Sequence, residues 1–312
     1  MNLSTSSSKS RPVFRLYRSI FRPLVICIFL VVLYQTLIVG GVVPPSSGIN
    51  QWQGNVVKAE RYVYEKKSDI KIAIVGSSIG NRIKPEYIGP NVANLAMSAY
   101  SSQTGLEIVK RNKLKPSTVL IEINNTIARE LNQKMIDYLY NPVFYLLRSY
   151  LPILRQEYQP ISVLISYLKD SKGKNKPQGD EEKNALASPK LRKRLIDNLI
   201  KTRMNPLQAE IAEKIRQEAE NIKAQIAALK ESGVRVVLFN VPGEARVEQT
   251  IAERQERKLI EEIFPQDTFE WLPEPPSENW RTEDGIHLID SNAKKYGAFL
   301  KEKLENLAPR SF

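Results

Sequence analysis

The sequence predicts an α/β domain, a three-layer sandwich with a mainly parallel sheet, that follows a single N-terminal transmembrane helix. Three observations predict this architecture. Short apolar segments rich in β-branched residues alternate with segments of helical periodicity, which is typical of a parallel sheet covered on both faces. A run of twenty uncharged residues lies near the N-terminus. The whole chain has 312 residues and is 42% hydrophobic, so a large core remains possible after that run is set aside.

The N-terminal run is long enough to cross a bilayer. Residues 24–43 read LVICIFLVVLYQTLIVGGVV, and twenty helical residues at 1.5 Å each span a hydrocarbon core of about 30 Å. Five Lys/Arg lie in residues 1–23, and no basic residue follows the run until Lys58. By the positive-inside rule, residues 1–23 are a cytoplasmic tail and the chain after Val43 is extracytoplasmic.

A cleaved signal peptide is the competing interpretation of this segment. The long basic lead, the length of the apolar run and the absence of an Ala-x-Ala site disfavour cleavage, although Val39-Gly40-Gly41 is a weak candidate site. Residues 44–70, which begin with Pro44-Pro45-Ser46-Ser47-Gly48, are expected to form a tether. The aromatic residues Trp52, Tyr62 and Tyr64 are expected either at the headgroup level or packed on the domain.

The net charge of +12 does not indicate nucleic-acid binding. Residues 1–59 contain six Lys/Arg and no acid, so half of the excess charge belongs to the membrane-proximal segment. The other half is spread over the rest of the chain without a basic stripe interleaved with aromatic residues.

The elements of the domain, residues 71–312, follow from local patterns. Strands are expected at 71–75, 92–96, 118–123 and 234–240, with a fifth candidate at 269–272. Helices are expected at 104–113, 207–229 and 291–307, of which the second has apolar residues spaced by three and four and stops at Ser232-Gly233.

Residues 131–190 interrupt this alternation and are interpreted as an insertion. Its first part holds six of the thirteen tyrosines and three prolines. Its second part, 170–184, is polar and broken by Gly and Pro. The aromatic part is expected either to pack as a lid or to form a docking surface.

The scarcity of His and Cys excludes several kinds of site. Cys27 is the only cysteine and lies in the apolar run, so there is no disulfide framework or Cys-based metal site. His287 is the only histidine, which excludes a multi-His zinc centre, and no Asp-rich loop suggests Mg²⁺ or Ca²⁺. No cofactor or metal is expected.

Acid, base and hydroxyl groups for nucleophilic catalysis are nevertheless present. Ser77 and Ser78 follow the first predicted strand, and Asp284 precedes His287 by three residues. Ser, His and Asp are the groups needed to activate a hydroxyl, orient its base and stabilise the resulting imidazolium.

Four blocks of the sequence, in order, resemble the SGNH (GDSL-type) hydrolase family in its membrane-anchored branch. They are Gly76-Ser77-Ser78, Asn94-Leu95-Ala96-Met97-Ser98-Ala99, Glu122-Ile123-Asn124-Asn125 and Asp284-Gly285-Ile286-His287-Leu288. The resemblance covers about 71–128 and 234–308. It implies a flavodoxin-like sheet of the SGNH type.

The resemblance also implies roles for particular residues. Ser78 would be the nucleophile, His287 its base and Asp284 the acid that orients the base. The backbone N–H groups of Ser78 and Ala99 and the Asn124 side-chain amide would form the oxyanion hole.

Three positions depart from the family pattern. Ser77 replaces the usual Asp and is an alternative nucleophile, Ala99 replaces a Gly, and Glu122 stands where the third block usually has Gly. Non-catalytic interpretations stay open. The two serines could be helix-capping turn residues, Asp284 and His287 could form a loop salt bridge, and Asn124-Asn125 could be strand-end turn residues.

The expected function is a membrane-tethered, extracytoplasmic serine esterase or acyltransferase that acts on O-acyl groups of an envelope polysaccharide or a related glycolipid acceptor. A transferase would require a multi-spanning membrane partner that supplies the acyl group, and the aromatic insertion is its candidate contact. The alternatives are an inactive SGNH-like scaffold in an envelope-polymer assembly, and an unrelated anchored α/β domain with an accidental triad.

Overall fold

The computed structural model describes residues 11–65, 69–124, 126–173 and 188–306. At its centre lies a parallel four-stranded sheet with strand order β2-β1-β3-β4. The strands are β1 (Ile72–Val75), β2 (Val92–Asn94), β3 (Thr118–Glu122) and β4 (Arg235–Phe239). The predicted α/β fold and all four principal strands are therefore confirmed.

The fifth strand candidate, 269–272, differs from the prediction. Trp271 makes only an isolated parallel bridge with Leu238, through backbone hydrogen bonds from Leu238 N to Glu270 O and from Leu272 N to Leu238 O, each 2.8 Å. Prolines at 265 and 273 flank the segment, and proline cannot donate to a ladder, so the pairing does not extend.

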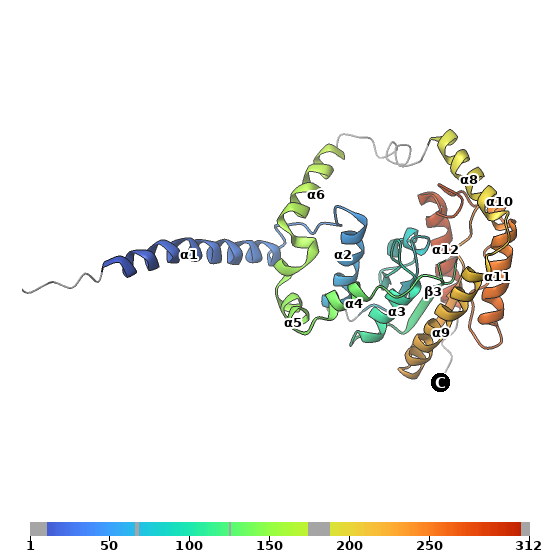
Figure 1. Ribbon diagram of the computed structural model, residues 1–312, viewed down its shortest axis with the longest axis horizontal. Helices are drawn as coiled ribbons and strands as arrows, with labels where there is room; N and C mark the ends of the chain where they lie inside the picture. Colours follow the sequence, from blue (N-terminus) through green and yellow to red (C-terminus); the bar gives the residue numbers. More distant parts are fainter. Residues whose placement is uncertain (1–10, 66–68, 125, 174–187, 307–312) are drawn as a thin grey trace, which may run out of the picture.

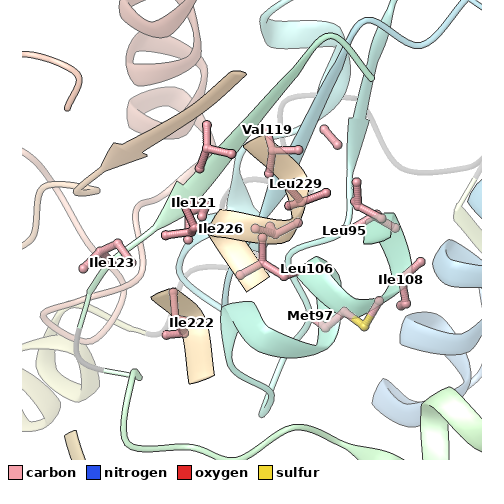
Figure 2. Packing of buried hydrophobic residues seen from close by; sticks show 14 of the residues in the cluster. Leu95, Met97, Leu106, Ile108, Val119, Ile121, Ile123, Ile222, Ile226 and Leu229 are labelled. Carbon is pink, nitrogen blue, oxygen red and sulfur yellow. The ribbon is translucent and has the colours of Figure 1, made fainter. Parts of the chain in front are cut away.

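Two layers of apolar side chains cover the two faces of the sheet, because successive strand residues point to opposite sides. On one face, residues such as Val119 and Ile121 pack against α3 (Ser102–Arg111) and α9 (Ala209–Glu231), through Leu106, Ile226 and Leu229 (Figure 2). On the other face, residues such as Leu120 and Phe239 pack under α12 (Asp290–Asn306) and two short 3-10 turns, η1 (Gly80–Arg82) and η2 (Pro85–Tyr87). The expected helices at 104–113, 207–229 and 291–307 match these elements closely.

The remaining helices surround this core. Three helices, α8 (Pro189–Arg203), α10 (Ala245–Glu248) and α11 (Ile251–Ile263), pack on one another, and α11 contacts α9 (Figure 1). The predicted insertion contains α4 (Gln133–Tyr140), α5 (Pro142–Tyr150), η3 (Pro152–Leu154), η4 (Gln156–Tyr158) and α6 (Pro160–Gly173). Most of its predicted polar part, 174–184, lies outside the described residues.

The expected tether over 44–70 is wrong for most of its length. Residues 51–64 form α2 (Gln51–Tyr64), begun by the Asn50 side chain, which accepts from Gln53 N. Val56 and Ala59 are fully buried in the core, and Tyr62 and Tyr64 are buried with them, whereas Trp52 is half exposed. The pattern that marks this helix is the apolar spacing Val56, Ala59 and Val63, which becomes meaningful only when a partner face is known.

The N-terminal helix α1 (Arg11–Val39) extends away from the rest of the molecule (Figure 1). Within the described part of the chain it is the one helix long and apolar enough to cross a membrane, over Phe21–Val39. The side chains from Leu24 to Leu33 are largely exposed, in keeping with an apolar helix that has no protein around it.

Candidate active site

Four loops meet at the carboxyl edge of the sheet, where parallel α/β folds usually carry their sites. The loop after β1 holds Ser77 and Ser78, the loop after β2 holds Ala99, the loop after β3 holds Asn124, and the segment before α12 holds Asp284 and His287. Since β1, β2 and β3 run in the same direction, the first three loops lie at one edge of the sheet. The hydrogen bond between His287 and Ser78 places the fourth segment, about 210 residues away in sequence, at the same edge.

Ser78, His287 and Asp284 form one hydrogen-bonded row. The His287 Nε2 atom lies 2.8 Å from Ser78 Oγ, and the Nδ1 atom lies 2.7 Å from Asp284 Oδ2. An ionised carboxylate can only accept, so Nδ1 carries the ring proton and donates it to Asp284. The Nε2 lone pair therefore faces the serine hydroxyl, which is the arrangement in which imidazole acts as a base toward serine.

The Asp284 carboxylate is held by its own turn. Its Oδ1 atom accepts from the backbone N–H groups of Ile286 at 3.2 Å and His287 at 3.0 Å. Burial raises the pKa of Asp284, but the hydrogen bonds from the His287 ring and from these two N–H groups outweigh it and lower the pKa to about 2. Asp284 is consequently ionised at neutral pH and fixes the orientation of the ring.

An ion pair joins the two loops that carry the triad. Arg82, in η1, donates from Nη1 and Nη2 to the two carboxylate oxygens of Glu283 at 3.0 and 2.6 Å. Arg82 lies four residues after Ser78, and Glu283 immediately precedes Asp284. The bidentate geometry fixes the distance between the hydroxyl and the imidazole more firmly than a single hydrogen bond would. Sequence reasoning missed this pair because nothing local links residues 201 positions apart.

The serine opens into a cleft of about 480 Å³. Its lining residues are Gln51, Ser78, Asn81, Arg82, Ser98, Ala99, Arg129 and His287. In the described part of the chain, neither the Ser78 nor the Ala99 backbone N–H has a hydrogen-bond acceptor. Both groups are therefore free to donate to a bound oxygen atom, and their oxyanion role stays a prediction.

Ala99 has an unusual backbone conformation. Its φ of +67° is the only positive value at a non-glycine residue among those described. The left-handed region disfavours a side chain that has a Cβ, so the surrounding loop must hold the conformation. Asn55 donates to Ser98 O at 2.9 Å and Asn81 donates to Ser98 Oγ at 3.2 Å. These bonds hold Ser98, the residue before Ala99, and both residues line the cleft.

Lys58, in α2, is bonded to the same loops. Its ammonium group donates to Ala96 O at 2.7 Å and to Asn81 Oδ1, and burial lowers the pKa of Lys58 to about 8. Lys58 and Asn81 also line a second cavity of about 530 Å³ between α2 and the β2 edge of the sheet. No local pattern marks Lys58 or Asn81, because their roles depend on the contact between α2 and the loop after β1.

Asn124 lies where the oxyanion role is not supported. Its side-chain amide donates to Val241 O at 3.0 Å and its Oδ1 atom accepts from Val241 N at 2.9 Å. Both polar ends are used to tie β3 to the segment after β4, and Asn124 does not line the cleft. The neighbouring Asn125 lies outside the described residues.

Ser77, the alternative nucleophile, points away from the base. It is fully buried, and its hydroxyl donates to Glu122 Oε2 at 2.8 Å. The same oxygen accepts from Ser77 N at 2.6 Å and Gly80 N at 3.3 Å. The geometry therefore separates the two serines: Ser78 faces His287, and Ser77 anchors the loop.

Glu122 explains two features of this loop. A Cβ on residue 76 would lie 2.5 Å from Glu122 Oε2 and 2.6 Å from its Cβ, so only glycine allows the carboxylate to approach. The carboxylate also fixes the loop after β1, because it accepts from the backbone N–H groups of Ser77 and Gly80. Burial raises the pKa of Glu122, and the hydrogen bonds from Ser77, Gly80 and Asn124 oppose that rise.

No metal centre is visible in the part of the chain that the structure describes, where no three His, Cys, Asp or Glu side chains converge.

Comparison with known proteins adds little detail. No protein-family model and no curated protein matches this sequence. Among solved structures, the chain is similar to a GDSL-like lipase from Bacteroides thetaiotaomicron, with 14% sequence identity and a TM-score of 0.40 over 80% of this chain and 98% of that one. At this level of similarity the function must come from the atoms of the site.

Proposed function

We propose that this protein is a membrane-anchored serine esterase or O-acyltransferase related to the SGNH hydrolases, with Ser78 as nucleophile. The observation that carries the proposal is the row Ser78 Oγ–His287 Nε2 and His287 Nδ1–Asp284 Oδ2, at 2.8 and 2.7 Å, at the end of β1 and beside an open cleft. A turn serine or a loop salt bridge alone would not require this alignment.

The chemistry follows from these contacts. Ser78 Oγ attacks the ester carbonyl while its proton passes to His287 Nε2, and Asp284 stabilises the imidazolium. The negative charge that develops on the carbonyl oxygen is met by the N–H groups of Ser78 and Ala99. The leaving alkoxide takes the proton from His287, and the acyl group remains on Ser78. Water or a sugar hydroxyl then attacks the acyl-enzyme while His287 Nε2 takes its proton. The bond between the acyl group and Ser78 Oγ breaks, and His287 returns the proton to Ser78 Oγ.

The contacts of α1 support a retained anchor over a cleaved signal peptide. Tyr34 donates its hydroxyl to Tyr158 O at 2.9 Å, Gln35 Oε1 accepts from Ile153 N at 3.0 Å, and Ile38 is buried. Cleavage near Val39–Gly41 would leave these partners on η3 and η4 uncovered. With the basic tail inside, the site would face the envelope.

The acceptor proposed is an O-acylated envelope polysaccharide or a related glycolipid. The open cleft, lined by Arg82 and Arg129, suits a polar and extended substrate better than a small enclosed one. If the reaction is transfer, a multi-spanning membrane protein would supply the acyl group.

One observation favours the inactive scaffold as the second candidate. Asn124 is committed to Val241, so the oxyanion would be met by two backbone donors instead of three groups. Losing one such donor typically costs about 3–4 kcal/mol of transition-state stabilisation.

Covalent labelling distinguishes the two candidates. The full chain in detergent would be treated with a fluorophosphonate, whose phosphorus bonds to an activated serine as fluoride leaves, and the modified peptide would be identified by mass spectrometry. We expect an adduct on Ser78 that is absent in His287→Ala and retained in Ser77→Ala. An unmodified Ser78 in a folded protein would reject catalysis and favour the scaffold.

A further inference from the structure

In the insertion, apolar side chains are exposed and charged side chains are buried, the reverse of a usual water-facing surface. From Pro142 to Leu168 the exposed residues are apolar, aromatic or proline, with Gln159 as the only exception. We call the exposed apolar residues of α5, η3 and α6 the collar. They are Val143, Phe144, Leu146, Leu147, Tyr150, Leu151, Leu154, Ile161, Leu164, Tyr167 and Leu168. Exposed apolar surfaces of this extent on soluble domains usually mark an interaction site.

All three charged residues in this stretch are turned inward. Arg148 donates to Tyr138 O at 2.7 Å and lies over the Tyr138 ring. Arg155 donates to Arg148 O at 2.9 Å, and Glu157 accepts from Arg61 at 2.7 Å while its side chain is fully buried. A water-facing surface carries charges outward, whereas a lipid-facing one excludes them.

The collar adjoins the end of α1. The contacts of Tyr34 and Gln35 with η4 and η3 place α5 and α6 beside the last turns of the anchor (Figure 1). On its inner side α6 is fixed to the domain by hydrogen bonds from Gln53 to Ser162 at 2.6 Å and between the Ser46 and Ser166 hydroxyls at 2.8 Å. The surface is therefore continuous with an apolar helix and held rigidly against it.

The length of α1 sets the depth of this surface in the bilayer. From Phe21 to Tyr34 the helix rises only about 20 Å, against a hydrocarbon core of about 30 Å. The remaining 10 Å or so must come from the segment that already packs against η3 and η4. Tilting of α1 would lower the domain further toward the membrane.

We propose that the collar is immersed in the outer leaflet, with lipid acyl chains as its occupant, so that α5, η3 and α6 and the last turns of α1 form one membrane-embedded base. This proposal rests on the retained anchor but not on catalysis. Immersion of the collar also sets the position of the cleft. Gln51 lines the cleft, and Gln53, two residues later, donates a hydrogen bond to Ser162 of α6. The cleft is thereby held close to the headgroups, where a lipid-linked acceptor would be presented.

Single-cysteine labelling tests the immersion. In a full-length Cys27→Ser background, cysteines would replace Leu146 and Leu164 in the collar, and Lys258 on α11 would be the exposed control. The protein would be reconstituted in vesicles of phosphatidylcholine and phosphatidylglycerol and treated with a membrane-impermeant maleimide. We expect collar cysteines to react at least about tenfold more slowly than the control, since hydrocarbon raises the pKa of a thiol by a unit or more and the thiolate is the reacting form.

A second measurement identifies what covers the surface. A fluorophore attached at each position in detergent should be quenched, after reconstitution, by lipids with nitroxides on their acyl chains, at 146 and 164 but not at 258. Equal maleimide rates and no quenching would overturn the proposal. Protection in native membranes but reactivity in pure lipid would overturn it in favour of a protein partner.

The outcome is separate from that of the proposed function. Neither readout needs turnover, so an inactive triad would leave both unchanged. Intact mass of the purified chain would reveal a cleaved anchor directly.

Discussion

Replacement of Asp284 by Asn is the most direct test of the triad. The side chain keeps its shape and its place in the turn but loses the charge that holds the His287 ring. Its amide can donate to Nδ1, which then has to be the unprotonated nitrogen, and Nε2 would carry the proton and face Ser78 as a donor. His287 would therefore present a proton instead of a lone pair to Ser78, and its protonated form would lack the neighbouring negative charge.

The magnitude follows from the geometry. The Asp284 and His287 side chains are 33% and 19% exposed, so an effective dielectric constant of about 20 applies. At a charge separation of about 4 Å the lost attraction to the imidazolium is about 4 kcal/mol. Since each 1.36 kcal/mol is tenfold in rate, kcat/KM should fall by about a thousandfold.

The assay is hydrolysis of p-nitrophenyl acetate, with the fluorophosphonate labelling rate as a second readout. Asp290→Asn is the matched control, because Asp290 is 56% exposed and pairs with Lys84 and Tyr87 outside the cleft. We expect this control to keep the wild-type rate. If Asp284→Asn stays within about threefold of wild type while Ser78→Ala is inactive, the carboxylate does not orient the base and the reasoning fails.

Three further predictions concern stability in detergent. Ala99→Gly should leave the free energy of unfolding unchanged or raise it by up to about 1 kcal/mol, because relief of the left-handed backbone offsets the gain in unfolded-state entropy. The control Ala224→Gly, at an exposed position in α9, should lower the free energy of unfolding by about 1 kcal/mol. Urea titration measures both, and a loss at position 99 as large as that at position 224 would show that Ala99 is unstrained. Glu122→Ala should lower the free energy of unfolding by about 3 kcal/mol or more, since it leaves the buried N–H groups of Ser77 and Gly80 unpaired. Glu122→Gln keeps an acceptor oxygen at the same place and should recover much of that loss. Equal losses in the two variants would mean that shape and hydrogen bonding at this position are unimportant. Burial raises the pKa of Glu60 from 4.5 to about 7, so between these two pH values the folded state binds a proton that the unfolded state has lost. The free energy of unfolding of the wild type, relative to that of Glu60→Gln, should therefore fall by about 3 kcal/mol as the pH rises from about 4.5 to about 7. A difference between the two proteins that does not change with pH would contradict this.

Local pattern was sufficient for the sheet and for the long apolar N-terminal helix. The four strands are short runs of β-branched residues that are buried on both faces, and such runs need no knowledge of their neighbours to be recognised. The apolar N-terminal helix is equally local, because its twenty uncharged residues are consecutive and long enough to span a bilayer. α2 was missed for the opposite reason, since its buried face is defined only by the helices and sheet that it contacts.

The site divides in the same way. A single histidine three residues after an aspartate, and two serines after the first strand, already pointed to His287, Asp284 and either Ser77 or Ser78. Only the tertiary structure distinguished Ser78 from Ser77, because the choice depends on which hydroxyl faces the imidazole and which is consumed by Glu122. Likewise, only the fold assigned Asn124 to Val241 and paired Arg82 with Glu283. The sequence by itself determined which chemical groups the protein has and roughly where each element lies. Their use was decided by contacts between residues far apart in the chain, which local preferences do not encode.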